Sequence, residues 1–190
     1  MHPRSLLLPL FAVLAVGCLG SLRHDATAEA ILLAPREVLG LPVRDNRPYW
    51  LLRGTPGWRS AHEIRFGGNP SDPAVATVRV ARFRDADAAR AAYARLTPAY
   101  LYAAYRDRMT DEPVPFEYPE PLPGDEVATY LYGVKLPATA PEGATLLGQL
   151  TALRAGSAVL LVESIGVEPD QLVPALAELV RRAHEVEARP

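Results

Sequence analysis

The sequence TLLGQLTALRAGSAVLLV, residues 145–162, decides the fold class. Thr145 to Arg154 predicts a strand, Ala155 to Ser157 predicts a tight turn, and Ala158 to Val162 predicts a second strand. The second strand is apolar without alternation, which is typical of a central strand covered on both faces. Two consecutive strands joined by a short turn predict an antiparallel hairpin at the centre of a sheet.

The segments around this hairpin extend the pattern in both directions. Alternating apolar and polar residues predict further strands at Ser60–Phe66, Val75–Arg84 and Glu126–Leu136. Helical spacing predicts a helix after Arg84, another after Thr97 and a terminal helix from Asp170. Hairpins predominate, so we expect an α+β fold in which a largely antiparallel sheet of about five strands has helices packed on one face.

Side chains that can cap helices support these assignments. Asp85 can accept hydrogen bonds from free amides of the first helix, and Thr97 can do the same for the second, with Pro98 at its first position. A single kinked helix through Pro98 remains the alternative. A short helix is also predicted over Ala28–Leu39, before the breakers Gly40 and Pro42.

Two segments are predicted to lack long regular elements. Residues 45–57 are rich in Gly and Pro around Tyr49-Trp50-Leu51-Leu52, which indicates a loop or one short strand. Residues 111–124 contain five prolines among acidic residues, so neither a helix nor a central strand is compatible with them. The second segment is therefore predicted to be an extended surface loop.

The N-terminus has the features of an export signal. Arg4 precedes an apolar run from Leu6 to Val16, which is shorter than the ~20 residues that a membrane-spanning helix needs. Leu14-Ala15-Val16-Gly17-Cys18 resembles the lipobox of bacterial lipoproteins, in which the cysteine is lipidated and becomes the mature N-terminus. Cys18 is the only cysteine of the chain, so no intramolecular disulfide can form.

These observations predict a processed and anchored protein. Residues 1–17 would form the signal peptide, residues 18–27 a tether, and residues 28–190 a single extracytoplasmic domain. Lipid on Cys18 would hold the protein at the outer face of the cytoplasmic membrane or in the periplasm at the outer membrane. The alternative is ordinary signal-peptidase cleavage after Ala28 or Ala30, which gives a protein without an anchor.

Composition and motifs limit the possible functions. The chain is 49% hydrophobic and 22% charged with a net charge of -2, so the positive field that nucleic-acid binding requires is absent from the sequence. No pair among the four His residues has metal-ligand spacing, and no phosphate-binding loop or nucleophile elbow is present. We therefore expect neither a cofactor nor a metal, and a protein that is not an enzyme.

The tyrosines are the candidate ligand-binding residues. Some lie on the helices predicted after Asp85, and others share one face of the strand Glu126–Leu136. Their rings could line a pocket between helix and sheet, although packing in an ordinary core is the competing interpretation. The candidates are Tyr93, Tyr102, Tyr105, Tyr130 and Tyr132.

Two segments carry a resemblance to a known class of domain. Leu153–Val162, followed by a capped terminal helix, and Arg82–Ala89, a strand that leads into a capped Ala-rich helix, resemble the corresponding parts of bacterial extracytoplasmic sensor-like lipoprotein domains such as the PknH-like extracellular domain. The resemblance implies a module that binds a ligand or a partner without catalysis.

Three functions remain open from the sequence. The first is a membrane-anchored accessory module that binds a small molecule or an envelope protein. The second is an exported hydrolase with a site assembled from dispersed residues, for which His62, Glu63 and Asp125 are candidates. The third is a structural envelope lipoprotein that contacts other proteins through its proline-rich loop.

Overall fold

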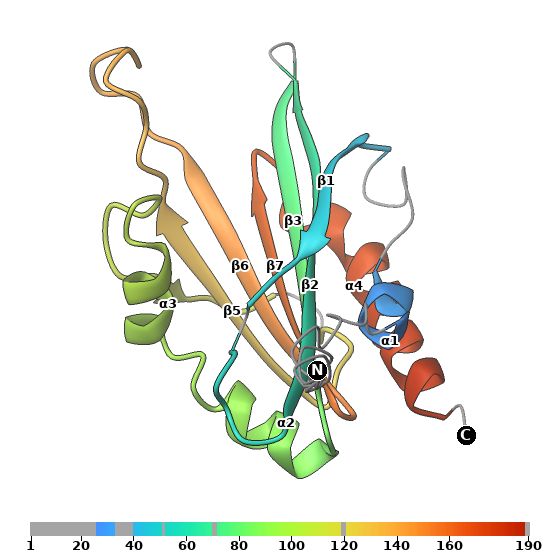
Figure 1. Ribbon diagram of the computed structural model, residues 1–190. Coiled ribbons are helices and arrows are strands. Elements are labelled where there is room, and N and C mark those ends of the chain that lie inside the picture. Colours follow the sequence, from blue (N-terminus) through green and yellow to red (C-terminus); the bar gives the residue numbers. More distant parts are fainter. Residues whose placement is uncertain (1–25, 33–39, 51, 70–71, 119–120, 189–190) are drawn as a thin grey trace, which may run out of the picture.

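The computed structural model describes residues 26–32, 40–50, 52–69, 72–118 and 121–188. Within these ranges the chain forms one antiparallel sheet with the strand order β1-β2-β3-β7-β6-β5-β4 (Figure 1). The α+β class and the antiparallel sheet are as predicted. The described strands are β1 (Val43–Pro48), β2 (Trp58–Asn69), β3 (Asp72–Phe83), β4 (Val114–Pro115), β5 (Glu126–Gly133), β6 (Leu147–Ala155) and β7 (Ala158–Ile165).

The predicted central hairpin is present as β6 and β7, with Ala155 paired to Ala158 across the turn. β7 also pairs with β3, so hydrogen-bonded neighbours flank it on both sides. Every residue of β7 from Ala158 to Ser164 is buried. The unbroken apolar run therefore marks the centre of the sheet, as expected for a strand that is covered on both faces.

Helices cover both faces of the sheet, and the prediction of helices on one face was wrong. α1 (Ala26–Ile31) and α4 (Pro169–Glu187) pack on one side, and α2 (Ala86–Tyr93) and α3 (Pro98–Tyr105) lie on the other (Figure 1). We call the first side the α4 face and the second the ionic face. α2 and α3 follow β3 along the chain, and α4 follows β7. The chain therefore leaves the sheet on opposite sides after these two strands.

Side-chain alternation along β3 explains the two layers. Val78 and Val80 point to the α4 face and pack in the same cluster as Leu160 and Leu176. Ala81 and Phe83, on positions of the opposite parity, pack with Leu101 of α3 and its neighbours. The apolar residues of both parities in the sequence reflect burial on both faces.

The caps predicted for the two internal helices are confirmed. Asp85 Oδ1 accepts a hydrogen bond of 2.8 Å from the Ala88 amide at the start of α2. Thr97 Oγ1 accepts one of 3.2 Å from the Tyr100 amide at the start of α3, and Pro98 is its first residue. The two helices are separate elements, so the single kinked helix is not formed.

The sequence prediction missed the edge strand β4, and it left β1 open because the segment from residue 45 was expected to be a loop or one short strand. β1 reads VRDNRP and is mostly exposed, so it has no apolar alternation to reveal it. β4 has two residues, both exposed, and belongs to the segment that we expected to be a loop. Pro48 ends β1 and Pro115 ends β4, in agreement with the confinement of proline to edges.

The N-terminal predictions are only partly covered by the described residues. The helix expected over Ala28–Leu39 is described over Ala26–Ile31, where Ile31 is buried against the α4 face. Cys18, the signal peptide 1–17 and almost all of the tether 18–27 lie outside the described residues. Within the described ranges, no helix has the length and apolar character needed to cross a bilayer.

Candidate functional site: an ionic network on the sheet

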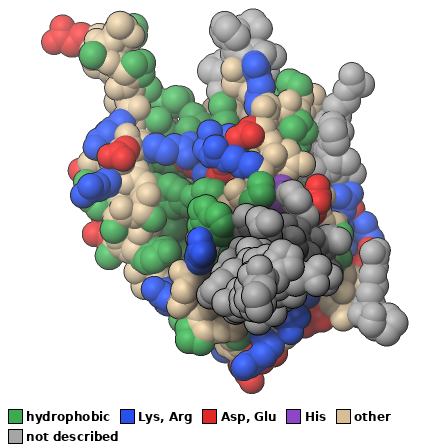
Figure 2. Space-filling view, viewed as in Figure 1, with side chains coloured by type: hydrophobic (Ala, Val, Ile, Leu, Met, Phe, Trp, Pro, Cys, Tyr) green, Lys and Arg blue, Asp and Glu red, His purple; other side chains and the backbone are tan. Residues whose placement is uncertain are grey.

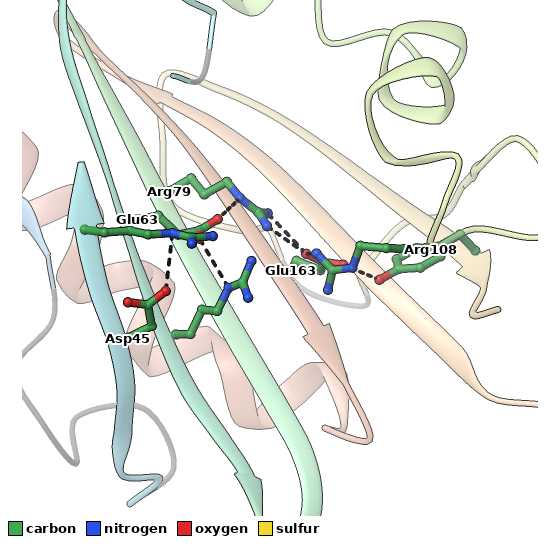
Figure 3. A network of polar contacts seen from close by, with 8 residues as sticks. Asp45, Glu63, Arg79, Arg108 and Glu163 are labelled. Atoms are coloured by element: carbon green, nitrogen blue, oxygen red, sulfur yellow. Dashed lines mark hydrogen bonds and ion pairs between the residues drawn. The ribbon is translucent and has the colours of Figure 1, made fainter. Parts of the chain in front are cut away.

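Charged side chains lie in the interior of the ionic face, on the neighbouring strands β2, β3 and β7. Glu63 of β2 is directly opposite Arg79 of β3, and Arg79 Nε donates a hydrogen bond of 2.6 Å to Glu63 Oε2. The same guanidinium donates from Nη1 and Nη2 to Oε2 of Glu163 on β7, at 3.1 and 3.2 Å. All three side chains are at most 2% exposed. Arg79 is thus a buried bridge between two carboxylates (Figure 3).

Two tyrosine rings flank the buried guanidinium. The carbon at its centre lies 5.0 Å from the ring centroid of Tyr105 on α3 and 5.3 Å from that of Tyr49, which follows β1. Cations are attracted to aromatic faces at such distances, especially in sites without water. The position of α3 over the sheet is therefore linked to the position of Arg79.

The Glu163 carboxylate is held from a third direction by Tyr132 of β5, whose hydroxyl donates to Oε1 at 2.6 Å. The Tyr132 ring lies over Gly148 of β6, so a Cβ at that glycine would lie 2.2 Å from the ring atom Cζ. Gly148 is therefore required for the close approach of the ring. The absence of one side chain on β6 permits the ring to reach across to β7.

Three further arginines contact the carboxylates from the solvent side. Arg47 of β1 donates from Nε and Nη2 to Glu63 Oε1 at 3.1 and 2.9 Å, and Arg65 Nε lies 3.2 Å from the same oxygen. Arg108, which follows α3, donates from Nη1 to Glu163 Oε2 at 2.8 Å. These three side chains are 47%, 40% and 37% exposed, respectively. They present guanidinium groups to solvent above a buried ionic layer.

Burial and charge have opposite effects on the titration of Glu63. Burial raises the pKa of its carboxyl group, but the charge of Arg79 and the hydrogen bonds from Arg79 and Arg47 lower it more, so the net pKa lies below the ordinary value. For Arg79, burial lowers the pKa, while the neighbouring Tyr105, Glu163 and Glu63 raise it to a net value above the ordinary one. Both groups are therefore charged near neutral pH.

The chemistry available to this network is recognition by charge and hydrogen bonding. Each Glu63 oxygen is contacted by an arginine, and both Glu163 oxygens accept hydrogen bonds. A general base needs a free oxygen and a pKa near the working pH, and Glu63 has neither. The guanidinium groups of Arg47 and Arg108, in contrast, keep donors that make no hydrogen bond to the described residues.

The residues proposed for a dispersed hydrolase site are not brought together. His62 and Glu63 are consecutive on β2 and point to opposite faces, and His62 Nε2 contacts Asn46 Oδ1 on β1. Asp125 Oδ2 accepts hydrogen bonds of 2.8 Å from Arg154 Nη1 and from the Gly156 amide. The described residues also hold no group of three His, Cys, Asp or Glu side chains placed to ligate a metal.

The five candidate tyrosines all belong to the packing of the ionic face. Tyr105, Tyr130 and Tyr132 are buried in it, and Tyr93 and Tyr102 are half-buried against it. Burial raises the pKa of Tyr93 to about 12, with additional effects of Tyr130 and Glu126. Tyr130 donates its hydroxyl hydrogen to the Leu96 carbonyl at 3.2 Å. Their role in ligand binding stays a prediction.

A separate open cleft of about 530 Å³ lies between the proline-rich loop and the outer edge of β5. Phe116 and Tyr118 form part of its wall, with ring centroids 5.2 Å apart. Among the described residues that line it, Glu117 is the charged one, and of the five candidate tyrosines the lining includes Tyr130. The cleft is thus mainly apolar and lies apart from the ionic network.

The central residues of the network were missed by the sequence analysis. Arg79 interrupts the apolar run of β3, and Glu163 directly follows the apolar run of β7. The available signal was a positive charge in one apolar strand and a negative charge at the end of another. Charged residues are rarely buried without a partner, so this combination favours an ion pair between the two strands. The strand pairing that joins them was not available from periodicity.

Comparison with known proteins shows a shared fold. No family model matches the sequence, and no curated protein matches it at a significant level. Among solved structures, the extracellular domain of PknH from Mycobacterium tuberculosis is similar, with a TM-score of 0.57 and 14% sequence identity. The match covers 85% of this chain and 96% of that domain. The chain therefore has the fold of the PknH extracellular domain, in agreement with the resemblance found in its sequence.

Proposed function

We propose that this chain is a non-catalytic binding or accessory module that works outside the cytoplasm, attached to a membrane through lipid on Cys18. The observation that carries the binding role is the row of half-exposed arginines over the ionic network. Arg47, Arg65 and Arg108 are held in place by buried carboxylates and still face solvent. Such preorganised donors favour recognition of a ligand over chemical conversion.

The proposed location rests on the N-terminal sequence and is supported by the shared fold. Arg4, the apolar run 6–16 and the lone Cys18 are typical of an exported lipoprotein. The similar solved structure is that of an extracellular domain. Export and binding are separate parts of the proposal, so each needs its own experiment.

Mass spectrometry of the mature N-terminus tests the anchor. We expect a diacylglycerol-modified chain that begins at Cys18, and release of the Cys18→Ala variant from the membrane fraction. An unmodified chain that begins at Glu29 or Ile31 would instead support cleavage after Ala28 or Ala30.

Retention of ligands from an envelope extract tests the binding role. The purified protein would be incubated with the extract, washed and analysed by mass spectrometry next to the Arg47→Gln/Arg108→Gln double variant. A compound retained only by the unchanged protein supports the proposal. Turnover of ester or glycoside substrates that is abolished by Glu63→Gln would favour the hydrolase alternative and contradict it.

A second candidate function, docking of an envelope protein, is favoured by the cleft beside β5. Its apolar walls and the acidic side chain of Glu117 could accept an extended segment of another protein. A photo-reactive amino acid in place of Phe116 would test this role by forming an adduct in whole cells. The same amino acid at the exposed Leu147, which is not among the cleft residues, is the matched control.

A further inference from the structure

Arg65 forms an ion pair with Glu63 but no hydrogen bond within the described part of the chain. Its Nε atom is shielded from solvent and makes no hydrogen bond to any described residue, although it lies 3.2 Å from Glu63 Oε1. That oxygen already accepts two hydrogen bonds from Arg47. The Arg65 side chain is nevertheless 40% exposed, so a ligand in solvent can reach the guanidinium beyond the shielded Nε atom.

The neighbours of Arg65 supply more donors at the same place. Arg47 contacts the same oxygen of Glu63, so the two guanidinium groups lie next to each other. Arg108 contacts the Glu163 oxygen that Arg79 also binds, which places it at the other end of the network. Figure 2 shows Lys and Arg side chains in a band across this face, between the β2–β3 hairpin and the β5–β6 loop.

The carboxylates beneath the band do not leave it neutral. Arg47, Arg65, Arg79 and Arg108 provide four positive charges, and Asp45, Glu63 and Glu163 provide three negative ones. Both oxygens of each buried carboxylate are turned toward an arginine or toward Tyr132. Their charge is therefore absorbed within the network, while the excess positive charge and the unused donors are at its solvent side.

We infer that this band binds a phosphate group. The guanidinium of Arg65 makes no hydrogen bond among the described residues, and Arg47 Nη1 and Arg108 Nε and Nη2 are likewise unused there. These donors belong to three different guanidinium groups and outnumber the two oxygens of one carboxylate. A phosphate offers three or four oxygens that point in different directions, so it can accept from all three groups. The inference rests on the proposed binding function and names the chemical class of its ligand.

Two sources carry this chemistry, a free phosphate compound and the headgroup of an anionic lipid. Inorganic phosphate would be titrated into the ¹⁵N-labelled protein while the arginine Nε–Hε signals are followed by NMR, with sodium chloride at matched ionic strength as reference. Sedimentation with vesicles of phosphatidylglycerol in phosphatidylcholine tests the lipid. Sodium acetate tests whether a carboxylate is sufficient.

We expect saturable shifts of the Arg65 and Arg47 Nε–Hε signals with phosphate, or sedimentation with the anionic vesicles. Arg65→Gln should weaken whichever binding is seen about tenfold, as for the loss of a charge-assisted hydrogen bond. Arg181→Gln removes the same charge from α4, where Arg181 pairs with Glu178 and Glu185, and should leave binding unchanged.

The following outcomes would overturn the phosphate assignment. They are equal shifts with chloride, acetate binding as strong as phosphate binding, and equal losses in the Arg65→Gln and Arg181→Gln variants. Absence of binding in both the phosphate and the vesicle experiments would also overturn it. If an envelope compound is retained equally by the unchanged protein and by Arg65→Gln, the binding function stands and only the phosphate assignment fails.

Discussion

The two faces of the sheet are stabilised by different interactions. On the α4 face, aliphatic side chains such as Leu160 and Leu176 pack against each other. On the ionic face, the apolar packing around Leu101 and Phe83 borders the Glu63–Arg79–Glu163 bridge. On the α4 face, the loss of stability caused by a substitution should depend on the side-chain volume removed. On the ionic face, it should depend on whether a buried charge loses its partner.

The largest expected effect is that of Arg79→Met. The substitution keeps much of the side-chain volume but removes the buried charge between Glu63 and Glu163, which then contact only the half-exposed Arg47, Arg65 and Arg108. We therefore expect a loss of about 4 kcal/mol in the free energy of unfolding. Urea denaturation at neutral pH measures the loss. The Glu63→Gln/Arg79→Met/Glu163→Gln variant, which removes the charges together, should recover part of it. A loss under about 1 kcal/mol for Arg79→Met would show that the two carboxylates do not depend on Arg79 for their stability in the interior.

The matched change on the other face is Leu160→Ala. Leu160 is fully buried, so the cavity should cost about 3 kcal/mol in the free energy of unfolding. Denaturation at neutral and at acidic pH should give the same difference from the unchanged protein, since no titrating group is removed. A difference that depends strongly on pH would mean that the two faces are energetically coupled.

A smaller effect distinguishes the faces through pH. The pKa of Glu63 is lowered in the folded protein, so its contribution to stability is present above the unfolded value of 4.5 and is lost as the pH falls through the folded value. The unfolding free energy of Glu63→Gln should therefore depend less on pH below about 4.5 than that of the unchanged protein. Parallel pH profiles for the two proteins would rule out this role of Glu63.

The smallest effect concerns the helix that covers the network. Thr97→Ala removes the hydroxyl that accepts from the Tyr100 amide and should destabilise the protein by about 1 kcal/mol. Thr97→Ser keeps the hydroxyl and serves as the control. If α3 helps to hold Arg79 through Tyr105, hydrogen exchange in α3 should also accelerate in Thr97→Ala, and unchanged exchange there would argue against that link.

The sequence predicted the long strands and capped helices because their signals are local. The alternation in Ser60–Phe66, the caps Asp85 and Thr97 and the apolar run Ala158–Val162 each depend on neighbours in the chain. The edge strand β1 lacks such a signal, and the side of the sheet on which each helix packs depends on the crossing of the chain after β3 and β7. The sequence of β3 has apolar residues on both of its faces, but it does not contain the strand order that determines which helix covers each face.

The ionic network could not be predicted for a related reason. Arg79 and Glu163 are far apart in the sequence, and only the pairing of β3 with β7 brings their strands together. Glu63 was considered solely as a candidate catalytic residue, although it is the cross-strand partner of Arg79. The tyrosines pack between the helices α2 and α3 and the sheet, but their spacing does not reveal that Tyr132 binds Glu163.

The composition of the two outer strands has a consequence for self-association. An exposed strand offers unpaired backbone groups to a second molecule, and growth of the sheet in that way leads to aggregates. In β1 the run Arg44-Asp45-Asn46-Arg47-Pro48 places charge and a missing amide along that border, while β4 limits the opposite border to two residues that include Pro115. Neighbouring copies of the protein would therefore be protected against polymerisation through their sheets.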